Sequence, residues 1–296
     1  MARFGTVLTA MVTPFDENGN LDLERAQKLA KYLVANGNDG IVVAGTTGES
    51  PTISYQEQRD LIMAVREAAP DASLVAGAGS NDTRTSVKNT EMATEAGADG
   101  ILSVTPYYNR PSQAGLLEHF RASAAATELP IMLYDVPGRT GRKIETATIV
   151  ELSQVDNIVA LKDAAGDPAE TANLIAKLPE GFEVYSGDDS LTLPFLSVGA
   201  VGVIGVVTHY VGRVMADMIA AYNDGRVVEA MKLNQRMLPA FAHFGYDDAP
   251  SPVPTKSMMN MLGVLVGDCR LPMGPAPADM DTRSKAVLTA LELVAA

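Results

Sequence analysis

The sequence predicts an α/β protein: a (β/α)8 (TIM) barrel with a C-terminal helical appendix. Eight short apolar runs alternate with amphipathic helical patterns within about the first 205 of 296 residues. Uninterrupted apolar strands separated by helices indicate a parallel sheet that is covered by helices. Eight such units favour a closed barrel over an open sheet. No Gly-x-Gly-x-x-Gly follows the first run, which weakens a dinucleotide-binding alternative.

An internal repeat supports this fold. Gly37-Asn-Asp-Gly-Ile41 recurs 60 residues later as Gly97-Ala-Asp-Gly-Ile101, and Gly199-Ala-Val-Gly-Val203 is a weaker third copy. Each copy lies where a helix is expected to end and a strand to begin. We interpret the first glycine as a left-handed helix cap and the second as a tight turn into the strand. A period of this length fits two βα units of about 30 residues each.

The elements follow in order along the chain. The first strand is expected at residues 7–12, and apolar residues at helical spacing follow at 26–34 before an Asn36-Gly37 stop. Ser54 and Glu57 form a capping box that opens another helix. The further barrel helices are predicted at residues 54–69 and 84–96. The remaining strands are predicted at residues 41–44, 73–78, 101–104, 131–134, 158–162, 183–186 and 201–205.

Only helical patterns follow the eighth strand. We therefore assign residues 1–225 to the barrel and residues 226–296 to a helical region packed on it. A Pro/Gly-rich stretch at residues 267–281 precedes a last helical pattern at residues 286–293. We interpret this stretch as a connection between the preceding region and one terminal helix, and not as a linker to a further domain.

Composition and charge exclude several classes of protein. Hydrophobic residues make up 47% and charged residues 20%, which is typical of a globular protein with a large core. The 36 acidic and 23 basic residues leave a net charge of −13, opposite to that of a nucleic-acid binder. One cysteine, Cys269, cannot form an internal disulfide, which favours a reducing compartment. With only three histidines beside it, a zinc site is not expected.

The sequence also argues against a secreted or membrane-spanning protein. Its N-terminus lacks the charged and apolar regions of a secretory signal. Residues 190–212 carry no charge and are long enough to span a bilayer, but Pro194 and several glycines interrupt them. The β-branched cluster at residues 201–207 fits a buried strand better. We therefore expect a soluble, cytoplasmic protein.

In this fold, chemistry gathers at the C-terminal ends of the strands. Lys162 closes the apolar run 158–162, so its side chain should enter an apolar barrel mouth. Removal from water disfavours the ammonium and makes the neutral amine accessible. Such an amine attacks a ketone to form a Schiff base, an electron sink for carbanion chemistry. A lysine solvated at a strand end is the alternative that this residue alone leaves open.

Other polar residues are expected on the same rim. Tyr134 ends the neighbouring strand and is either a proton shuttle or a core tyrosine with a satisfied hydroxyl. Thr46 and Thr47, between two glycines, form either a small-anion cradle or a plain tight turn. Arg139 is either a carboxylate clamp or a surface arginine. Each signal is weak alone, but the set on one rim favours a site.

Four motifs carry a resemblance to a known family. The motifs are Gly45-Thr-Thr-Gly-Glu-Ser50, Thr105-Pro-Tyr-Tyr-Asn-Arg-Pro111, Tyr134-Asp-Val-Pro-Gly-Arg-Thr-Gly141 and Ser186-Gly-Asp-Asp189. They resemble the 4-hydroxy-tetrahydrodipicolinate synthase (dihydrodipicolinate synthase) family of pyruvate-dependent class I aldolases, and the likeness extends to Arg270-Leu-Pro-Met273 near the end of the chain.

The resemblance implies a reaction and its catalytic residues. Lys162 would form the Schiff base with pyruvate, and Tyr134 would position pyruvate and transfer protons. Thr46 would link Tyr134 to Tyr108 in a hydroxyl relay, with Tyr108 entering from a neighbouring subunit. The product of pyruvate and L-aspartate 4-semialdehyde would be 4-hydroxy-tetrahydrodipicolinate, on the route to diaminopimelate and lysine. A homotetramer, a dimer of dimers without metal or other cofactor, is implied.

The resemblance also implies the substrate-binding residues. Thr47 would hold the pyruvate carboxylate and Arg139 the carboxylate of the semialdehyde. Gly187 and the Ile204 carbonyl would line the pocket. Sister aldolases and lyases for other aldehydes share the lysine and the first tyrosine, and a non-catalytic barrel that binds a small acid is a further alternative. The Val136-Pro-Gly-Arg139 segment and the paired tyrosines favour the synthase.

Feedback regulation is where the sequence departs from the family pattern. In lysine-inhibited bacterial members, histidine and glutamate side chains of an effector cleft hold lysine. Here Tyr55, Gln58 and Thr85 occupy the matching places. The family residues Ser50, Asn81 and Tyr107 are retained. The ammonium of lysine would lose its carboxylate partner, so we expect weak or absent inhibition by lysine.

Overall fold

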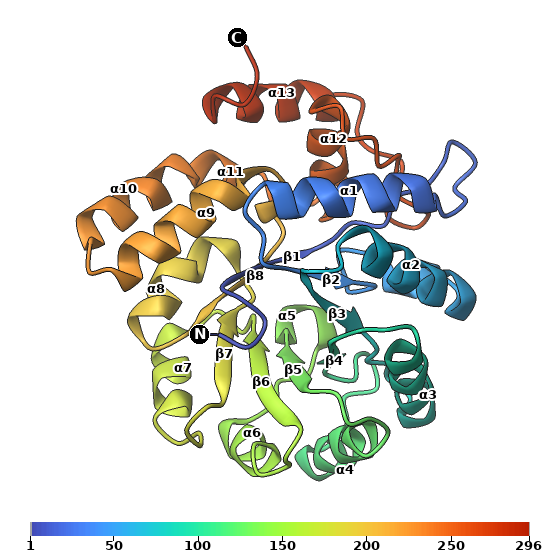
Figure 1. Cartoon of the computed structure of the whole chain (residues 1–296), viewed down its shortest axis with the longest axis vertical. Helices are drawn as coiled ribbons and strands as arrows, with labels where there is room; N and C mark the ends of the chain where they lie inside the picture. The colour runs from blue at the N-terminus through green and yellow to red at the C-terminus, as the bar shows by residue number, and fades with distance from the viewer. Residues whose placement is uncertain (1, 296) are drawn as a thin grey trace.

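The computed structural model describes residues 2–295 and contains a closed barrel of eight parallel strands (Figure 1). Each strand pairs with its neighbours in chain order, and the pairing of Leu8 with Ile204 closes the sheet. All eight predicted strands are confirmed, with boundaries that differ by two residues or fewer. They are β1 (Val7–Ala10), β2 (Gly40–Val43), β3 (Ser73–Gly77), β4 (Gly100–Val104), β5 (Ile131–Asp135), β6 (Ile158–Asp163), β7 (Glu183–Ser186) and β8 (Gly202–Gly205).

Helices surround this barrel (Figure 1). The capping box of α2 is confirmed: the Ser54 hydroxyl accepts from the Glu57 N–H, and the Glu57 carboxylate accepts from the Ser54 N–H. The helices of the barrel are α1 (Leu23–Ala35), α2 (Tyr55–Ala68), α3 (Thr83–Glu95), α4 (Gln113–Ala124), α5 (Pro137–Thr140), α6 (Thr146–Leu152), α7 (Pro168–Ile175), α8 (Thr192–Ser197) and α9 (Thr208–Asn223), with short 3₁₀ turns η1 (Ser50–Thr52) and η2 (Asp189–Leu191).

Four helices follow the barrel: α10 (Val227–Arg236), α11 (Leu238–Ala242), α12 (Val253–Met261) and α13 (Met280–Ala290). α10 packs on α9, and α12 packs on α13 and α9. The last helix begins earlier in the chain than the apolar pattern at residues 286–293 predicted. The uncharged stretch at residues 190–212 divides among α8, β8 and the start of α9. No helix in residues 2–295 is long and apolar enough to cross a membrane.

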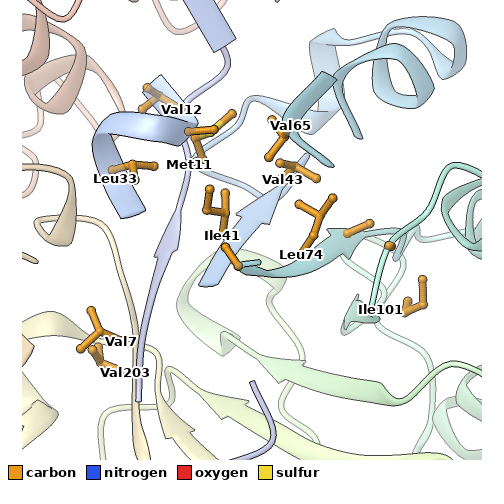
Figure 2. Close-up of a cluster of buried hydrophobic side chains, with 14 of the residues drawn as sticks. Val7, Met11, Val12, Leu33, Ile41, Val43, Val65, Leu74, Ile101 and Val203 are labelled. Atoms are coloured by element: carbon orange, nitrogen blue, oxygen red, sulfur yellow. The ribbon is translucent and has the colours of Figure 1, made fainter. Parts of the chain in front are cut away.

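Successive side chains along each strand point to opposite faces of the sheet, which creates two apolar layers. In β2, Val42 faces the barrel interior, whereas Ile41 and Val43 face the helices. Figure 2 shows part of the outer layer, where these two side chains lie in one cluster with Leu33 of α1 and Val65 of α2. The interior layer also holds one or two inward side chains from each remaining strand, so the barrel is a packed core and not a pore.

The repeated glycines are confirmed as caps, but the role assigned to the second glycine is wrong. The first glycine of each copy has a left-handed φ, 90°, 92° and 109° in chain order. The second glycines, at Gly40, Gly100 and Gly202, have no such φ and begin strands. They are needed for space: an added Cβ at Gly100 would lie 2.7 Å from the Phe4 ring, and one at Gly202 would overlap the Thr6 carbonyl.

Gly202→Ala is expected to destabilise the barrel, because the added methyl overlaps the rigid backbone of Thr6 where β8 begins. Such overpacking costs about 1–3 kcal/mol. Gly138→Ala is the matched control, since an added Cβ there meets nothing within 4 Å and should change stability by less than about 0.5 kcal/mol. Thermal melting checks both variants, and equal melting temperatures would contradict the steric explanation.

Candidate active site

Lys162 lies at the C-terminal end of β6 and is only 4% exposed. The solvated alternative therefore does not describe it. Tyr134 pairs with it in register on β5, so both side chains point to the same face of the sheet. The Lys162 Nζ lies 4.4 Å from the centroid of the Tyr134 ring, a cation–π distance. The barrel thus places an amine against a buried phenol.

The next residues of these strands carry buried carboxylates on the opposite face. Asp135 and Asp163 also pair in register. The Asp135 carboxylate accepts from the Ile144 N–H, with the Lys143 Nζ at 3.7 Å, while burial raises the pKa of Asp135 to about 6. Asp163 accepts from the Thr171 hydroxyl. These bonds fix the strand ends from outside and hold Tyr134 and Lys162 inward.

Thr46 and Thr47 lie on a turn after β2, which we call the 45–50 turn. The Glu49 N–H donates to the Thr46 carbonyl at 3.1 Å, and the Thr13 hydroxyl on the β1 side donates to the Gly48 carbonyl at 2.6 Å. The Thr47 side chain is buried and that of Thr46 is half-buried. The turn begins where β2 ends, on the rim of the barrel that also carries the end of β6.

Tyr108 projects away from its own barrel. It is 89% exposed and has a left-handed φ of 74°, on a loop where its N–H donates to the Thr140 carbonyl. Among the described residues, no hydrogen bond joins the hydroxyls of Tyr108, Thr46 and Tyr134. The hydroxyl relay stays a prediction, because one chain alone does not bring its members together.

A pocket of about 260 Å³ opens beside Tyr134, at the ends of β5 and β7. It brings together Tyr134, Arg139 and Gly187, which the sequence had assigned to one site. Lys162, the two threonines and Ile204 do not line it; Ile204 is fully buried in the barrel interior. The pocket is lined by Tyr134, Val136, Arg139, Ala164, Gly187, Asp188, Asp189, Ser190, Phe241 and Phe244.

Seven of the ten lining residues were missed as site residues, among them Phe241, Phe244 and Asp189. Phe241 and Phe244 come from α11 and the segment after it, and no local signal in the sequence ties them to the strand ends. Asp189 did have a signal, because it ends the Ser186-Gly-Asp-Asp189 motif. Its carboxylate accepts from the Val206 N–H at 2.9 Å, and burial raises its pKa to about 6. Gly205 leaves room for it, since an added Cβ would overlap the carboxylate.

The residues of the proposed effector cleft do not form one hydrogen-bonded group. Gln58 is buried and donates to the Gly77 carbonyl at 2.5 Å. The exposed Thr85 donates its hydroxyl to Asp82, and the Asn81 carbonyl accepts from Asn109. The side chains of Gln58 and Thr85 are thus already hydrogen-bonded to other residues of the chain.

The aromatic part of this cleft is already faced by a cation of the chain. The Lys88 Nζ lies 4.5 Å from the centroid of the half-exposed Tyr55 ring. Tyr107 is partly exposed beside Tyr108, and Ser50 is exposed at the start of η1. A cationic effector entering here would meet a positive charge and no carboxylate among the cleft residues assigned from the sequence.

The residues that could ligate a metal are separated. Within residues 2–295, no group of three or more His, Cys, Asp or Glu side chains is arranged to hold a metal ion. Burial lowers the pKa of His119 and of His209 to about 4, and His243 bonds to Tyr246 and Ser284. Burial raises the pKa of Cys269 to about 12, so it carries no thiolate near neutral pH.

Comparisons with known proteins agree with this geometry. Residues 3–291 match the model of the Dihydrodipicolinate synthetase family. The chain is 46% identical over 272 residues to a 4-hydroxy-tetrahydrodipicolinate synthase of Oceanobacillus iheyensis, covering 92% of each chain. It is 47% identical over 279 residues to that of Bacillus subtilis, covering 94% of this chain and 96% of the relative.

Solved structures also match this chain over nearly its whole length. The dihydrodipicolinate synthase of Bacillus anthracis superposes with a TM-score of 0.94 at 44% identity, covering 100% of both chains. That of Cyanidioschyzon merolae, with lysine bound, gives a TM-score of 0.96 at 39% identity, covering 99% of this chain and 100% of the other. The family model covers nearly the whole chain, and the relatives are 46–47% identical over more than nine-tenths of it, so this chain belongs to the dihydrodipicolinate synthetase family.

Proposed function

We propose that this chain is a Schiff-base lyase that condenses pyruvate with L-aspartate 4-semialdehyde to give 4-hydroxy-tetrahydrodipicolinate. The observation that carries the proposal is the buried Lys162 amine packed against Tyr134 beside a pocket that also holds Arg139. Relatives at 46–47% identity bear the name of this enzyme. The volume of this pocket, about 260 Å³, suits a small acid and leaves little room for a long substrate.

The chemistry follows from the groups present. The Lys162 amine adds to the ketone carbon of pyruvate, and loss of water gives an imine. Loss of a methyl proton gives an enamine, whose carbon attacks the aldehyde carbon of the second substrate. The amino group of the semialdehyde then attacks the imine carbon, which closes the ring and releases the Lys162 amine. We assign the proton transfers in these steps to the Tyr134 hydroxyl, because its ring packs against the Lys162 amine.

Carboxylate recognition completes the proposed site. Thr47, with the N–H groups of the 45–50 turn, binds the pyruvate carboxylate. Arg139, exposed at the rim of the pocket, binds the carboxylate of the semialdehyde through a charged hydrogen bond. The net charge of −13 repels both anions at long range, so these local groups must capture them. Gly187 forms part of the pocket wall, whereas Ile204 lies in the packed interior of the barrel.

The proposal extends to assembly and organisation. We propose a cytoplasmic homotetramer in which Tyr108 completes the active site of a neighbouring subunit, supported by its exposure on a fixed loop. One similar solved structure, 34% identical with a TM-score of 0.94, is that of a monomeric dihydrodipicolinate synthase variant, so the state needs measurement. We keep residues 1–225 as the barrel and 226–296 as the helical region, which supplies Phe241 and Phe244 to the pocket.

Incubation with pyruvate and borohydride is expected to attach a reduced pyruvyl group to Lys162, detected by peptide mass spectrometry. Lys162→Ala should abolish the adduct, because no other amine is assigned to the site. Lys88→Ala, on α3, is the control and should retain it. A wild-type enzyme without an adduct would overturn the proposed chemistry. An adduct without turnover of aspartate semialdehyde would assign the chain to a sister enzyme with another aldehyde.

Tyr108→Phe is expected to lower turnover by about 100-fold while the pyruvate adduct still forms, since the lost hydroxyl acts in proton transfer. The adduct and the steady-state rate are measured on the same preparation. Light scattering after gel filtration shows whether the variant assembles like the wild type. An equal loss of adduct and turnover would contradict the relay role.

Lysine is expected to inhibit weakly or not at all. A missing charged hydrogen bond to the effector ammonium costs about 1.5–3 kcal/mol, or roughly 10- to 100-fold in affinity. The Lys88 ammonium over Tyr55 opposes a second cation there. A steady-state titration with lysine checks this, and half-inhibition in the micromolar range would refute it.

A further inference from the structure

A buried ion pair lies directly behind the 45–50 turn. The Lys256 Nζ of α12 lies 2.7 Å from the Glu49 Oε1, and the two side chains are 2% and 1% exposed. The Lys256 ammonium also donates to the Asp268 carbonyl at 2.9 Å and lies 4.3 Å from the centroid of the Phe15 ring. The second carboxylate oxygen, Oε2 of Glu49, accepts from the Arg270 N–H at 2.9 Å. Both charges are therefore paired and hydrogen-bonded, as buried charges must be.

The backbone of Glu49 ties this pair to the candidate substrate site. Its φ of 56° is left-handed, a conformation that a residue with a Cβ adopts only when its surroundings impose it. In this conformation the Glu49 N–H donates to the Thr46 carbonyl and closes the turn that carries Thr47. Glu49 belongs to the turn itself, so a shift of its side chain displaces the backbone that positions Thr47.

A second contact holds the same segment from the C-terminal region. The Arg270 guanidinium pairs with the Glu57 carboxylate, donates to the Thr52 carbonyl at 2.6 Å and lies 4.2 Å from the Phe15 centroid. It lowers the pKa of Glu57 to about 2. The lysine and the arginine thus both lie against one phenyl ring. Residues 256–270 therefore serve as a brace for the segment that follows β2.

We propose that Glu49 and Lys256 are positioning residues for substrate binding: their ion pair sets the 45–50 turn so that Thr47 meets the pyruvate carboxylate. This inference rests on the proposed function, since it takes pyruvate as the ligand of the turn. It gives the C-terminal region a second role, distinct from its supply of Phe241 and Phe244 to the pocket. Neither residue of the pair touches the reacting atoms.

The stability of the fold alone would not require a charged pair at this place. Replacing a buried ion pair by neutral groups of similar volume is often neutral for stability, whereas removing one partner leaves an uncompensated charge. The pair fixes the directions of the Glu49 oxygens, because Oε1 faces the Lys256 ammonium and Oε2 accepts from the Arg270 N–H. The charged pair is therefore expected to matter for geometry even where a neutral pair would preserve the fold.

The test uses full-length variants and the pyruvate concentration that gives half-maximal borohydride trapping at Lys162. Glu49→Gln and the double variant Glu49→Gln/Lys256→Met are compared with Thr47→Ala, which marks the loss of the carboxylate contact. We expect all three to raise this concentration about tenfold, the effect of losing about one hydrogen bond. Trapping at saturating pyruvate should persist, and the KM for aspartate semialdehyde should change less than twofold.

Stability controls separate positioning from unfolding. Leu288→Ala removes a fully buried side chain of α13 and should lower the melting temperature without changing the pyruvate requirement. The double variant should melt closer to the wild type than Glu49→Gln does, yet keep the high pyruvate requirement. If Glu49→Gln does not fold, the double variant alone decides the question.

Three results would overturn the inference while leaving the proposed function intact. They are a wild-type pyruvate requirement in the double variant, an equal rise in Leu288→Ala, and a rise in Thr47→Ala that the Glu49 variants do not share. A wild-type protein that forms no adduct would instead overturn the proposed function, and the inference with it.

Discussion

The pairing of β1 with β8 is the constraint on which the rest of the molecule depends. It closes the sheet, so every strand end lies on one rim and the side chains of β5, β6 and β7 converge there. Closure also buries both faces of each strand, which explains why these segments are apolar almost throughout. Closure leaves little space at the opposite end of the barrel, so β2, β4 and β8 each begin with a glycine.

The register of β5 against β6 then decides which polar side chains face the barrel interior, where they can react, and which face the helices, where they form structural hydrogen bonds. Tyr134 and Lys162 point inward, and the adjacent Asp135 and Asp163 point outward to the helices. A slip of one residue would exchange these sets and place carboxylates at the barrel mouth. The outward bonds of the two aspartates are therefore as important for the site as the inward pair. They hold the strand ends where a lysine can be kept out of water.

The buried carboxylates around this site have hydrogen-bond or ion-pair partners. Asp189 accepts from the backbone that follows β8, and Glu49 is paired with Lys256 from α12. Each links a strand-end loop to an element distant in the chain. The helices after the barrel thus reach the site twice, through the aromatic residues of the pocket and through the brace behind the 45–50 turn. The proposed enzyme would depend on its C-terminal region for substrate binding as well as for stability.

The sequence by itself determined the local features: eight strands, the α2 capping box, the helix caps of the glycine repeat, and the residues that end each strand. These follow from periodicity and from residue types that act over a few positions, so a single sequence is enough to predict them. It did not reveal Phe241, Phe244 or the pairing of Glu49 with Lys256, because these contacts join residues that no local pattern relates. It also misjudged Gly100 and Gly202, whose small size is required by the adjacent Phe4 ring and Thr6 carbonyl and not by their own backbone. Only the tertiary structure decides such contacts, since packing and charge burial depend on which distant groups fill the same space.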